Sequence, residues 1–366
     1  MRIKVAALLT LSLIFGSTPA HAAVKANSAC SVLGKKVTVN KTPFVCSQSG
    51  KKPKWKIQKP SKPSIEQVKP LSLDNLEVSR VVKAAYDEVI KELKKSPRSN
   101  FQPTYYLSPN LDPARASREE EGLRRAIDLW APYYLPEKIQ VIYAVGSDGQ
   151  WVDAKVNELG LASMVPPAPW GPISKIMKSN FVCGNALAGQ SASGIPTFFQ
   201  CLDPGTEQGG YRQTGPHEYT HLFQMKYYGW KTNWYMEGAA SYFGWTLGFY
   251  PGDENAAQRR VWVKQMGLTA DKNTQGKISS RKDEELLQVF KSLESTVNSQ
   301  NESSISYFVG SLATEVLIAL YGFEKFIEFS KSFENSRGLS ANFESIYGVS
   351  LETFYTKLAH YIWANL

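Results

Sequence analysis

Two of the chain's four histidines stand four residues apart, in the run His217-Glu218-Tyr219-Thr220-His221. On an α-helix this spacing puts both imidazoles on one face, about 40° apart, where they can bind the same metal ion. The alternative is a surface helix that carries two histidines by chance. Because histidine is scarce in this chain, we take the pattern as a predicted metal site.

A catalytic metal ion needs a third protein ligand and one coordination position left for water. Histidine is not expected to supply that ligand, because His360 falls about 180° from the apolar stripe of the last predicted helix and should face water. A carboxylate is available at Glu237, within the apolar run 234–240 (WYMEGAA). An ordinary exposed glutamate is the alternative, but a lone carboxylate among these residues would be costly without a partner.

The segment between these residues indicates how they are positioned. Residues 229–233 (GWKTN) have turn character, so they should end the helix that carries the histidines. A second helix is expected to begin near Trp234, with Thr232 or Asn233 as its cap. Two antiparallel helices joined in this way can place Glu237 opposite the two histidines.

The residues 217–221, followed by 234–240, resemble the gluzincin zinc metallopeptidases, especially the peptidase MA-like group related to aminopeptidase N. The likeness covers roughly residues 190–366. It includes the run 306–312 (SYFVGSL), which is similar to the segment that carries the catalytic tyrosine of those enzymes, here Tyr307. The resemblance implies a zincin-like fold and one catalytic Zn²⁺ ion.

The same resemblance implies a role for each residue in the hydrolysis of a peptide or protein substrate. His217, His221 and Glu237 would bind the zinc ion, and Glu218 would act as general base towards the attacking water. Tyr307 would donate a hydrogen bond to the developing oxyanion. The alternative for Tyr307 is a packing role, since the chain has 18 tyrosines.

The chain departs from the family pattern at two places. Ser241 stands where thermolysin-like enzymes have an acid, so another group must support a zinc-binding histidine. The motif with which aminopeptidases grip a free amino terminus is absent, and residues 194–201 (GIPTFFQC) stand there as the expected edge strand along which a peptide lies. The second departure favours an endopeptidase over an aminopeptidase.

The wider pattern of elements predicts an α+β fold, with a small sheet and a mostly helical C-terminal half. Helices are expected over 75–95 and 114–130, and strands over 139–145 and 195–202. After residue 210 the periodicity is helical almost to the end. Ser350 is the expected cap of the last helix, whose apolar stripe is Leu351, Phe354, Tyr355, Leu358 and Ile362.

The N-terminus has the pattern of a secretory signal peptide over residues 1–22. Arg2 and Lys4 precede an apolar stretch, Val5–Phe15, which is too short to span a bilayer, and small residues follow at 20–22. A buried core helix is the alternative. We therefore expect a secreted or cell-envelope protein with no transmembrane segment in the mature chain.

Export permits disulfides, and the four cysteines form two local pairs, Cys30 with Cys46 and Cys183 with Cys201. Free buried thiols are the alternative. The first pair closes a small module over residues 23–57, which loosely resembles Cys-hairpin modules that follow the signal peptides of exported actinobacterial proteins. A Cys183–Cys201 bond would stiffen the loop and strand beside the cleft.

Positive charge is confined to the N-terminal part of the 366-residue chain. Residues 23–70 contain eleven lysines and one acid, whereas residues 71–366 carry a net charge of −3. After the small module, residues 58–72 are expected to form a linker and 73–366 the main domain. The basic part is either a tether to an anionic cell-envelope surface, such as cell wall or lipid headgroups, or a solvated linker. Nothing in the chain resembles a nucleic-acid-binding module.

Other chemistries have little support in the sequence. No nucleophile-elbow motif and no phosphate-binding glycine loop are present. The acids Glu119 and Glu121 are expected to be solvated on a charged helix face, and the aromatic residues of 234–250 are expected to form core rather than a carbohydrate platform. The competing hypothesis is a catalytically silent envelope-binding protein with a metallopeptidase fold, which would not need Glu218.

Overall fold

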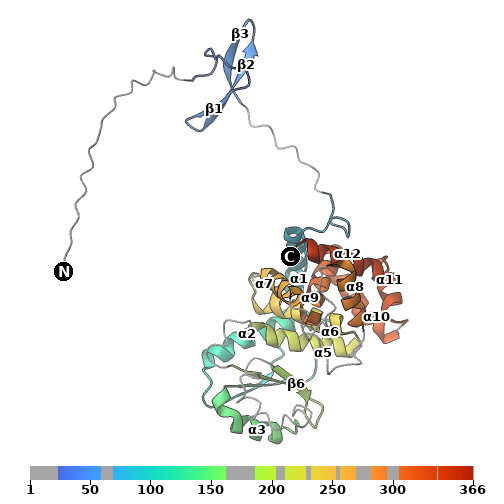
Figure 1. The fold of residues 1–366 in the computed structure, drawn as a ribbon. Coiled ribbons are helices and arrows are strands. Elements are labelled where there is room, and N and C mark those ends of the chain that lie inside the picture. Colours follow the sequence, from blue (N-terminus) through green and yellow to red (C-terminus); the bar gives the residue numbers. More distant parts are fainter. Residues whose placement is uncertain are drawn as a thin grey trace, which may run out of the picture. The chain divides into compact units, whose positions relative to one another are not determined.

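The computed structural model describes residues 24–58, 69–161, 186–202, 211–227, 232–252, 256–268, 282–294, 305–335 and 337–365 (Figure 1). The expected signal peptide, most of the expected linker and Cys183 of the expected second disulfide lie outside these residues. The chain divides into a small unit that ends at Pro70 and a large unit that begins at Leu71.

The small unit is a three-stranded antiparallel sheet in the order β1-β2-β3. Its strands are β1 (Lys36–Val39), β2 (Thr42–Ser49) and β3 (Lys52–Ile57). Because alternate strand residues point to opposite faces, Phe44, Cys46 and Trp55 form a small core on one side. The expected Cys30–Cys46 disulfide is confirmed, with Cα atoms 5.9 Å apart.

In the large unit, four strands form one mixed sheet in the order β4-β5-β7-β6. They are β4 (Thr104–Leu107), β5 (Gln140–Ala144), β6 (Ala186–Gln190) and β7 (Pro196–Cys201). β4, β5 and β7 run parallel, and β6 is antiparallel to β7. Along β5, Val141 and Tyr143 face the main helical core, whereas Ile142 and Ala144 face a second core with α3 (Gly149–Glu158).

The expectation that residues 194–201 form an edge strand is wrong. β7 lies between β5 and β6, and β6 is the edge strand beside it. Five of the six residues of β7 are buried, as in a strand that is covered on both faces. Such a strand has no alternation that distinguishes an edge from a centre, and the Gly- and Ala-containing run of β6 gives only a weak strand signal.

Helices make up most of the large unit. Besides α3 they are α1 (Val78–Lys95), α2 (Pro113–Trp130), α5 (Thr214–Tyr227), α6 (Asn233–Gly248), α7 (Ala256–Leu268), α8 (Asp283–Ser292), α9 (Ile305–Tyr321), α10 (Phe323–Ser332), α11 (Leu339–Tyr347) and α12 (Leu351–Ala364). The predicted α+β class, the first two helices and the strand at 139–145 are confirmed. In α12, Ser350 caps the N-terminus and the predicted apolar stripe is buried, as expected.

Helix α6 lies inside the helical part of the fold, and every one of its residues is buried. Its aromatic residues form core, as expected. At its contact with α9 the two backbones touch, because a Cβ added to Gly238 would lie 2.2 Å from the carbonyl carbon of Gly310. A Cβ on Gly310 would in turn lie 2.1 Å from the Trp234 carbonyl oxygen. Only glycine at both positions permits this close approach.

Among the described residues, no single helix is long and apolar enough to cross a membrane. The pair α9 and α10 reaches that length and composition together, but the two helices meet at an angle of 117°.

Candidate metal centre

Helix α5 is held in place by contacts that its histidines do not make. Phe223 stacks on Trp130 of α2, with ring centroids 4.2 Å apart. The Trp130 indole also donates a hydrogen bond to Thr220 (3.2 Å). These contacts fix the rotation of α5 about its axis, and the four-residue spacing then directs His217 and His221 to the same side.

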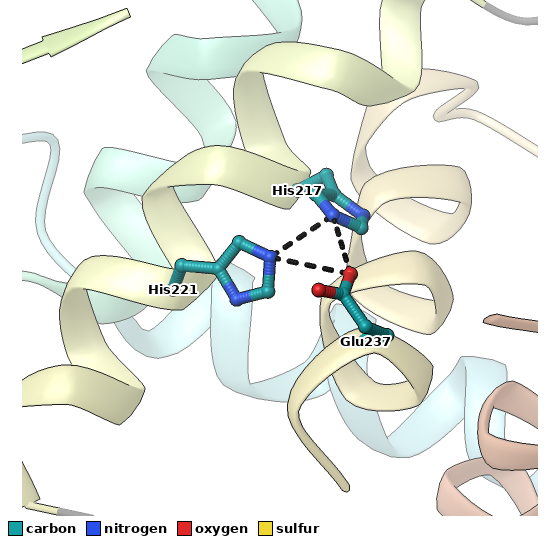
Figure 2. Close-up of side chains that lie close together, drawn as sticks. All are labelled: His217, His221 and Glu237. Carbon is teal, nitrogen blue, oxygen red and sulfur yellow. Dashed lines mark hydrogen bonds and ion pairs between the residues drawn. The ribbon is translucent and has the colours of Figure 1, made fainter. Parts of the chain in front are cut away.

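Helix α6 supplies the carboxylate. It begins at Asn233 with Thr232 in the N-cap position, which is one of the two expected caps. The Thr232 hydroxyl does not cap the helix but donates to the carbonyl of Glu294 (3.2 Å). Glu237 is only 4% exposed, and Figure 2 shows its carboxylate pointing toward the two imidazoles of the neighbouring helix.

Three side-chain atoms form a close triangle in this centre. The Nε2 atoms of His217 and His221 lie 3.1 Å apart, and Glu237 Oε2 lies 3.4 and 3.5 Å from them, respectively (Figure 2). A tetrahedral metal site with bonds of about 2.0–2.1 Å separates its ligand atoms by about 3.3–3.4 Å. The triangle therefore has the dimensions of one face of such a site.

The chemistry of these atoms also fits a metal ion. Glu237 Oε2 is buried and has no hydrogen-bond partner within the described part of the chain. Two imidazole nitrogens that face each other compete for one proton, whereas a cation between them can accept both lone pairs. This trio is the one group of three possible metal ligands that the described residues bring together.

The electrostatics of the centre favour positive charge. Burial opposes a charged imidazole at His221, but the carboxylate of Glu237 outweighs it and raises the pKa of His221 to about 9, with a further contribution from Glu218. Burial alone would raise the pKa of Glu237, but the two imidazoles hold it well below its ordinary value. The buried carboxylate and the two imidazoles therefore form an environment that stabilises positive charge, as a metal-binding site requires.

The centre is accessible from one side. His221 and Glu237 are buried, whereas His217, Glu218 and Tyr307 are half-buried. Two of the expected metal ligands, His221 and Glu237, thus lie in the interior, whereas His217 lies with Glu218 and Tyr307 on the partly exposed side. This arrangement suits a site that admits a ligand from the surface.

Tyr307 lies beside the centre, as the sequence predicted. Its ring stacks on His217, with centroids 5.8 Å apart and planes inclined by 6°. Tyr307 is one helical turn before Gly310 on α9, so the Gly238–Gly310 contact sets its distance from Glu237. In the Glu-Gly pair of the sequence, Glu237 thus points into the centre and Gly238 allows the close contact between α6 and α9.

His360 does not take part in the centre. Its side chain is 74% exposed, and its Nδ1 lies 3.0 Å from the Asp283 carboxylate. The prediction that it faces water is confirmed.

Gln224, which no motif of the sequence singles out, is completely buried one turn after His221. Its Oε1 lies 2.9 Å from His221 Nδ1, and its Nε2 donates to the carbonyls of Tyr235 and Met236 (3.0 and 3.1 Å). The departure at Ser241 indicated that another group must support a histidine. A glutamine three residues after the second histidine was the available signal.

The expectation that Glu119 is solvated is wrong. Its side chain, on α2, is buried and accepts a hydrogen bond from Gln200 of β7 (3.1 Å). Burial raises the pKa of Glu119 to about 7. Glu121, two residues on, is exposed and pairs with Arg125 (2.8 Å), as expected of a solvated acid. The two acids lie on different faces of the helix, and only tertiary packing covers one of them.

The chemistry of the centre is inferred from its own residues, because comparison with known proteins identifies no relative. No family model matches the chain, and no curated protein or solved structure is significantly similar to it.

Proposed function

We propose that the chain is an exported zinc metallopeptidase of the gluzincin type. The observation that carries this proposal is the convergence of His217, His221 and Glu237 from two helices onto one point. Two histidines of an HExxH run and a glutamate from the next helix are the ligand set expected of that class. The mixed sheet with an antiparallel edge strand beside these helices is compatible with a zincin-like fold.

The donor set supports zinc as the metal. Two imidazoles and one carboxylate suit Zn²⁺, and three protein ligands instead of four are typical of a catalytic site with an open position. When bound, the ion would supply a water molecule of lowered pKa and would polarise the substrate carbonyl. The Cys30–Cys46 disulfide is consistent with the extracellular location that the proposal requires.

The residues of the chain have distinct parts in this hydrolysis. Glu218, next to His217 on the accessible side, accepts a proton from the attacking water and returns it to the departing amine. Tyr307 donates a hydrogen bond from its hydroxyl to the developing oxyanion, and its stacking on His217 holds the ring in place. Endopeptidase activity is favoured over aminopeptidase activity, since the chain lacks the motif with which aminopeptidases bind a free amino terminus.

The test is a digest of a peptide library, with the cut sites identified by mass spectrometry. The zinc-loaded chain 23–366 is compared with Glu218→Gln, which should keep its zinc but lose cleavage by about 10²–10⁴-fold. Glu121→Gln is the matched control, because that glutamate is exposed and pairs with Arg125, not with a residue of the centre. Zinc binding without cleavage of any peptide would instead support the silent binding protein.

A further inference from the structure

The orientation of the buried Gln224 amide is fixed by two backbone groups. One terminal atom of the amide lies 3.0 Å from the carbonyl oxygen of Tyr235 and 3.1 Å from the carbonyl oxygen of Met236. A carbonyl oxygen only accepts hydrogen bonds, so the amide must present its NH₂ group to both. Its oxygen is then the atom that faces His221 Nδ1 at 2.9 Å.

This orientation decides which nitrogen of His221 carries the proton. The Gln224 oxygen only accepts, so Nδ1 must donate. In a neutral imidazole Nε2 is then unprotonated, and its lone pair is available to a metal ion. Nε2 is the atom of His221 that lies in the triangle with His217 and Glu237.

We propose that Gln224 is a positioning residue of the metal centre. It fixes the tautomer and the ring orientation of His221. Through the Tyr235 and Met236 carbonyls it also fixes the helical turn that leads into Glu237. One side chain thus sets the relative position of ligands from both helices. The inference rests on the proposed metal site and adds to it a residue that acts through its neighbours.

The experiment measures zinc affinity by competition with a chelator, for the chain 23–366 and three variants. Gln224→Met removes both hydrogen-bonding ends at similar volume. Gln224→Glu keeps an oxygen facing Nδ1. Gln200→Met is the matched control, because Gln200 is equally buried but bonds to Glu119 and not to a metal-binding residue. Thermal unfolding of each metal-free chain measures the structural cost separately.

We expect Gln224→Met to raise the dissociation constant for zinc by about 10–100-fold, as is typical when the partner of a metal-binding histidine is lost. Gln224→Glu should recover only part of that loss, because its oxygen still accepts from Nδ1 but its second oxygen cannot donate to the two carbonyls. Gln200→Met should stay within about threefold of the parent chain. Parent-like zinc affinity in Gln224→Met, or an equal loss in Gln200→Met, would overturn the inference and leave the proposed function standing. A parent chain that binds no zinc would overturn both.

A second measurement needs no variant. In the zinc-loaded parent chain, the ¹⁵N chemical shifts of His221 should show a protonated Nδ1 and a metal-bound Nε2. The opposite assignment would contradict the role of Gln224 even if the variants failed to fold.

A separate observation concerns the small unit, where lysines gather on one face of the sheet. Lys52, Lys54 and Lys56 alternate along β3 and are all exposed, while the residues between them point the other way. The strand register pairs Lys56 with Val45 and Val45 with Lys36, so Lys36 of β1 lies on the same face. We call these four lysines the lysine face.

The lysine face is a row of uncompensated charges. Residues 24–58 contain no Asp or Glu, and the described residues show no ion pair to these lysines. Alternate residues on a strand are about 6.6–6.8 Å apart, so β3 presents a regular line of positive charge. The exposed Ile57 points to the opposite face. The strand residues that share the lysine face include only two apolar ones, Pro43 and the half-buried Val45, which offer little surface to insert into a bilayer.

We infer that the lysine face binds an extended polyanion that carries phosphate groups along its length. The probe is long-chain inorganic polyphosphate, titrated against the chain 23–366 at several salt concentrations. The variant Lys52→Gln/Lys54→Gln/Lys56→Gln is compared with Lys25→Gln/Lys41→Gln/Lys51→Gln, which removes the same charge from positions outside the three alternating strand sites. Vesicles of phosphatidylglycerol form the competing arm.

We expect the strand variant to lose at least tenfold in affinity and the control less than about threefold, with a shallower salt dependence for the strand variant. Equal losses in both variants would show that only net charge matters and would overturn the inference. Stronger binding to the vesicles than to polyphosphate would overturn it in favour of a lipid surface.

Discussion

The small unit and the large unit are stabilised in different ways, the first by a crosslink and the second by an extensive apolar core. The small unit has a core of Phe44, Cys46 and Trp55, which is too little apolar surface to hold a sheet by burial alone, and the Cys30–Cys46 bond crosslinks it. The large unit has an extensive core that runs through its helices and one face of its sheet. Its stability therefore comes from burial.

The same difference governs where each unit keeps its charges. Within residues 24–58 of the small unit, the charged residues are all lysines. The large unit encloses charged groups, including Arg259 and Glu315, which are both fully buried and bond to each other at 2.6 Å. A large core can tolerate the desolvation of such groups when each has a partner. This tolerance is what allows His221 and Glu237 to form a buried centre.

The largest expected effect is a loss of zinc affinity in the large unit, which contains the metal centre. Glu237→Gln replaces a carboxylate by a weaker neutral ligand, so we expect zinc affinity to fall by more than about 100-fold, beyond the loss for a supporting residue. Bound zinc after dialysis measures this. His360→Gln is the control, since that histidine is exposed. Unchanged zinc content in Glu237→Gln would remove Glu237 from the centre.

The close contact between α6 and α9 should tolerate no added side-chain atom at Gly238. Gly238→Ala places a methyl group 2.2 Å from the Gly310 backbone, so the helices must separate, at a cost of about 3 kcal/mol in unfolding free energy. Gly50→Ala in the small unit has no atom within 4 Å and should cost only about 1 kcal/mol from its positive φ. Chemical denaturation of each variant checks the contrast, and equal effects would contradict it.

The disulfide should matter for one unit only. Cys30→Ser/Cys46→Ser opens a crosslink with a sequence separation of 16 residues, which removes about 3 kcal/mol from the small unit and is expected to unfold it. The unfolding midpoint of the large unit and its zinc affinity should stay the same. Limited proteolysis followed by mass spectrometry locates the unfolded segment. A small unit that resists proteolysis without the bond would refute the comparison.

The smallest effect concerns pH. Burial raises the pKa of Glu119 from 4.5 to about 7, so the folded state holds a proton that the unfolded state releases between these values. The contribution of Glu119 to the stability of the large unit is then fully present below pH 4.5 and is lost as pH rises to about 7. Glu119→Gln should remove this fall, raising the unfolding free energy at pH 8 by on the order of 2 kcal/mol.

Denaturant titrations from pH 4 to 8 measure that profile, with Glu121→Gln as the exposed control. The small unit contains no Asp, Glu or His within residues 24–58, so its own stability should not change over this range. A flat profile for the parent large unit would contradict the burial of a titrating Glu119.

Local patterns in the sequence determined a good part of the protein. The shared face of His217 and His221 follows from helical periodicity, and the stripe and cap of α12 follow from residues within a few positions of each other. The Cys30–Cys46 bond joins two residues that are only 16 positions apart, one of them in β2. These features could be predicted because the interactions that form them connect residues close in sequence.

Only the tertiary structure decided how the elements meet. The sequence offered Glu237 as a ligand, but its distance to the histidines depends on the packing of α5 against α6. The central place of β7 and the burial of Glu119 depend on which surfaces cover them. Gln224 contacts His221 in its own helix and two carbonyls of α6, and the sequence indicated this only through its position three residues after His221. Each of these depends on contacts between residues far apart in the chain, which are set by the packing of whole surfaces and not by the periodicity of any one segment.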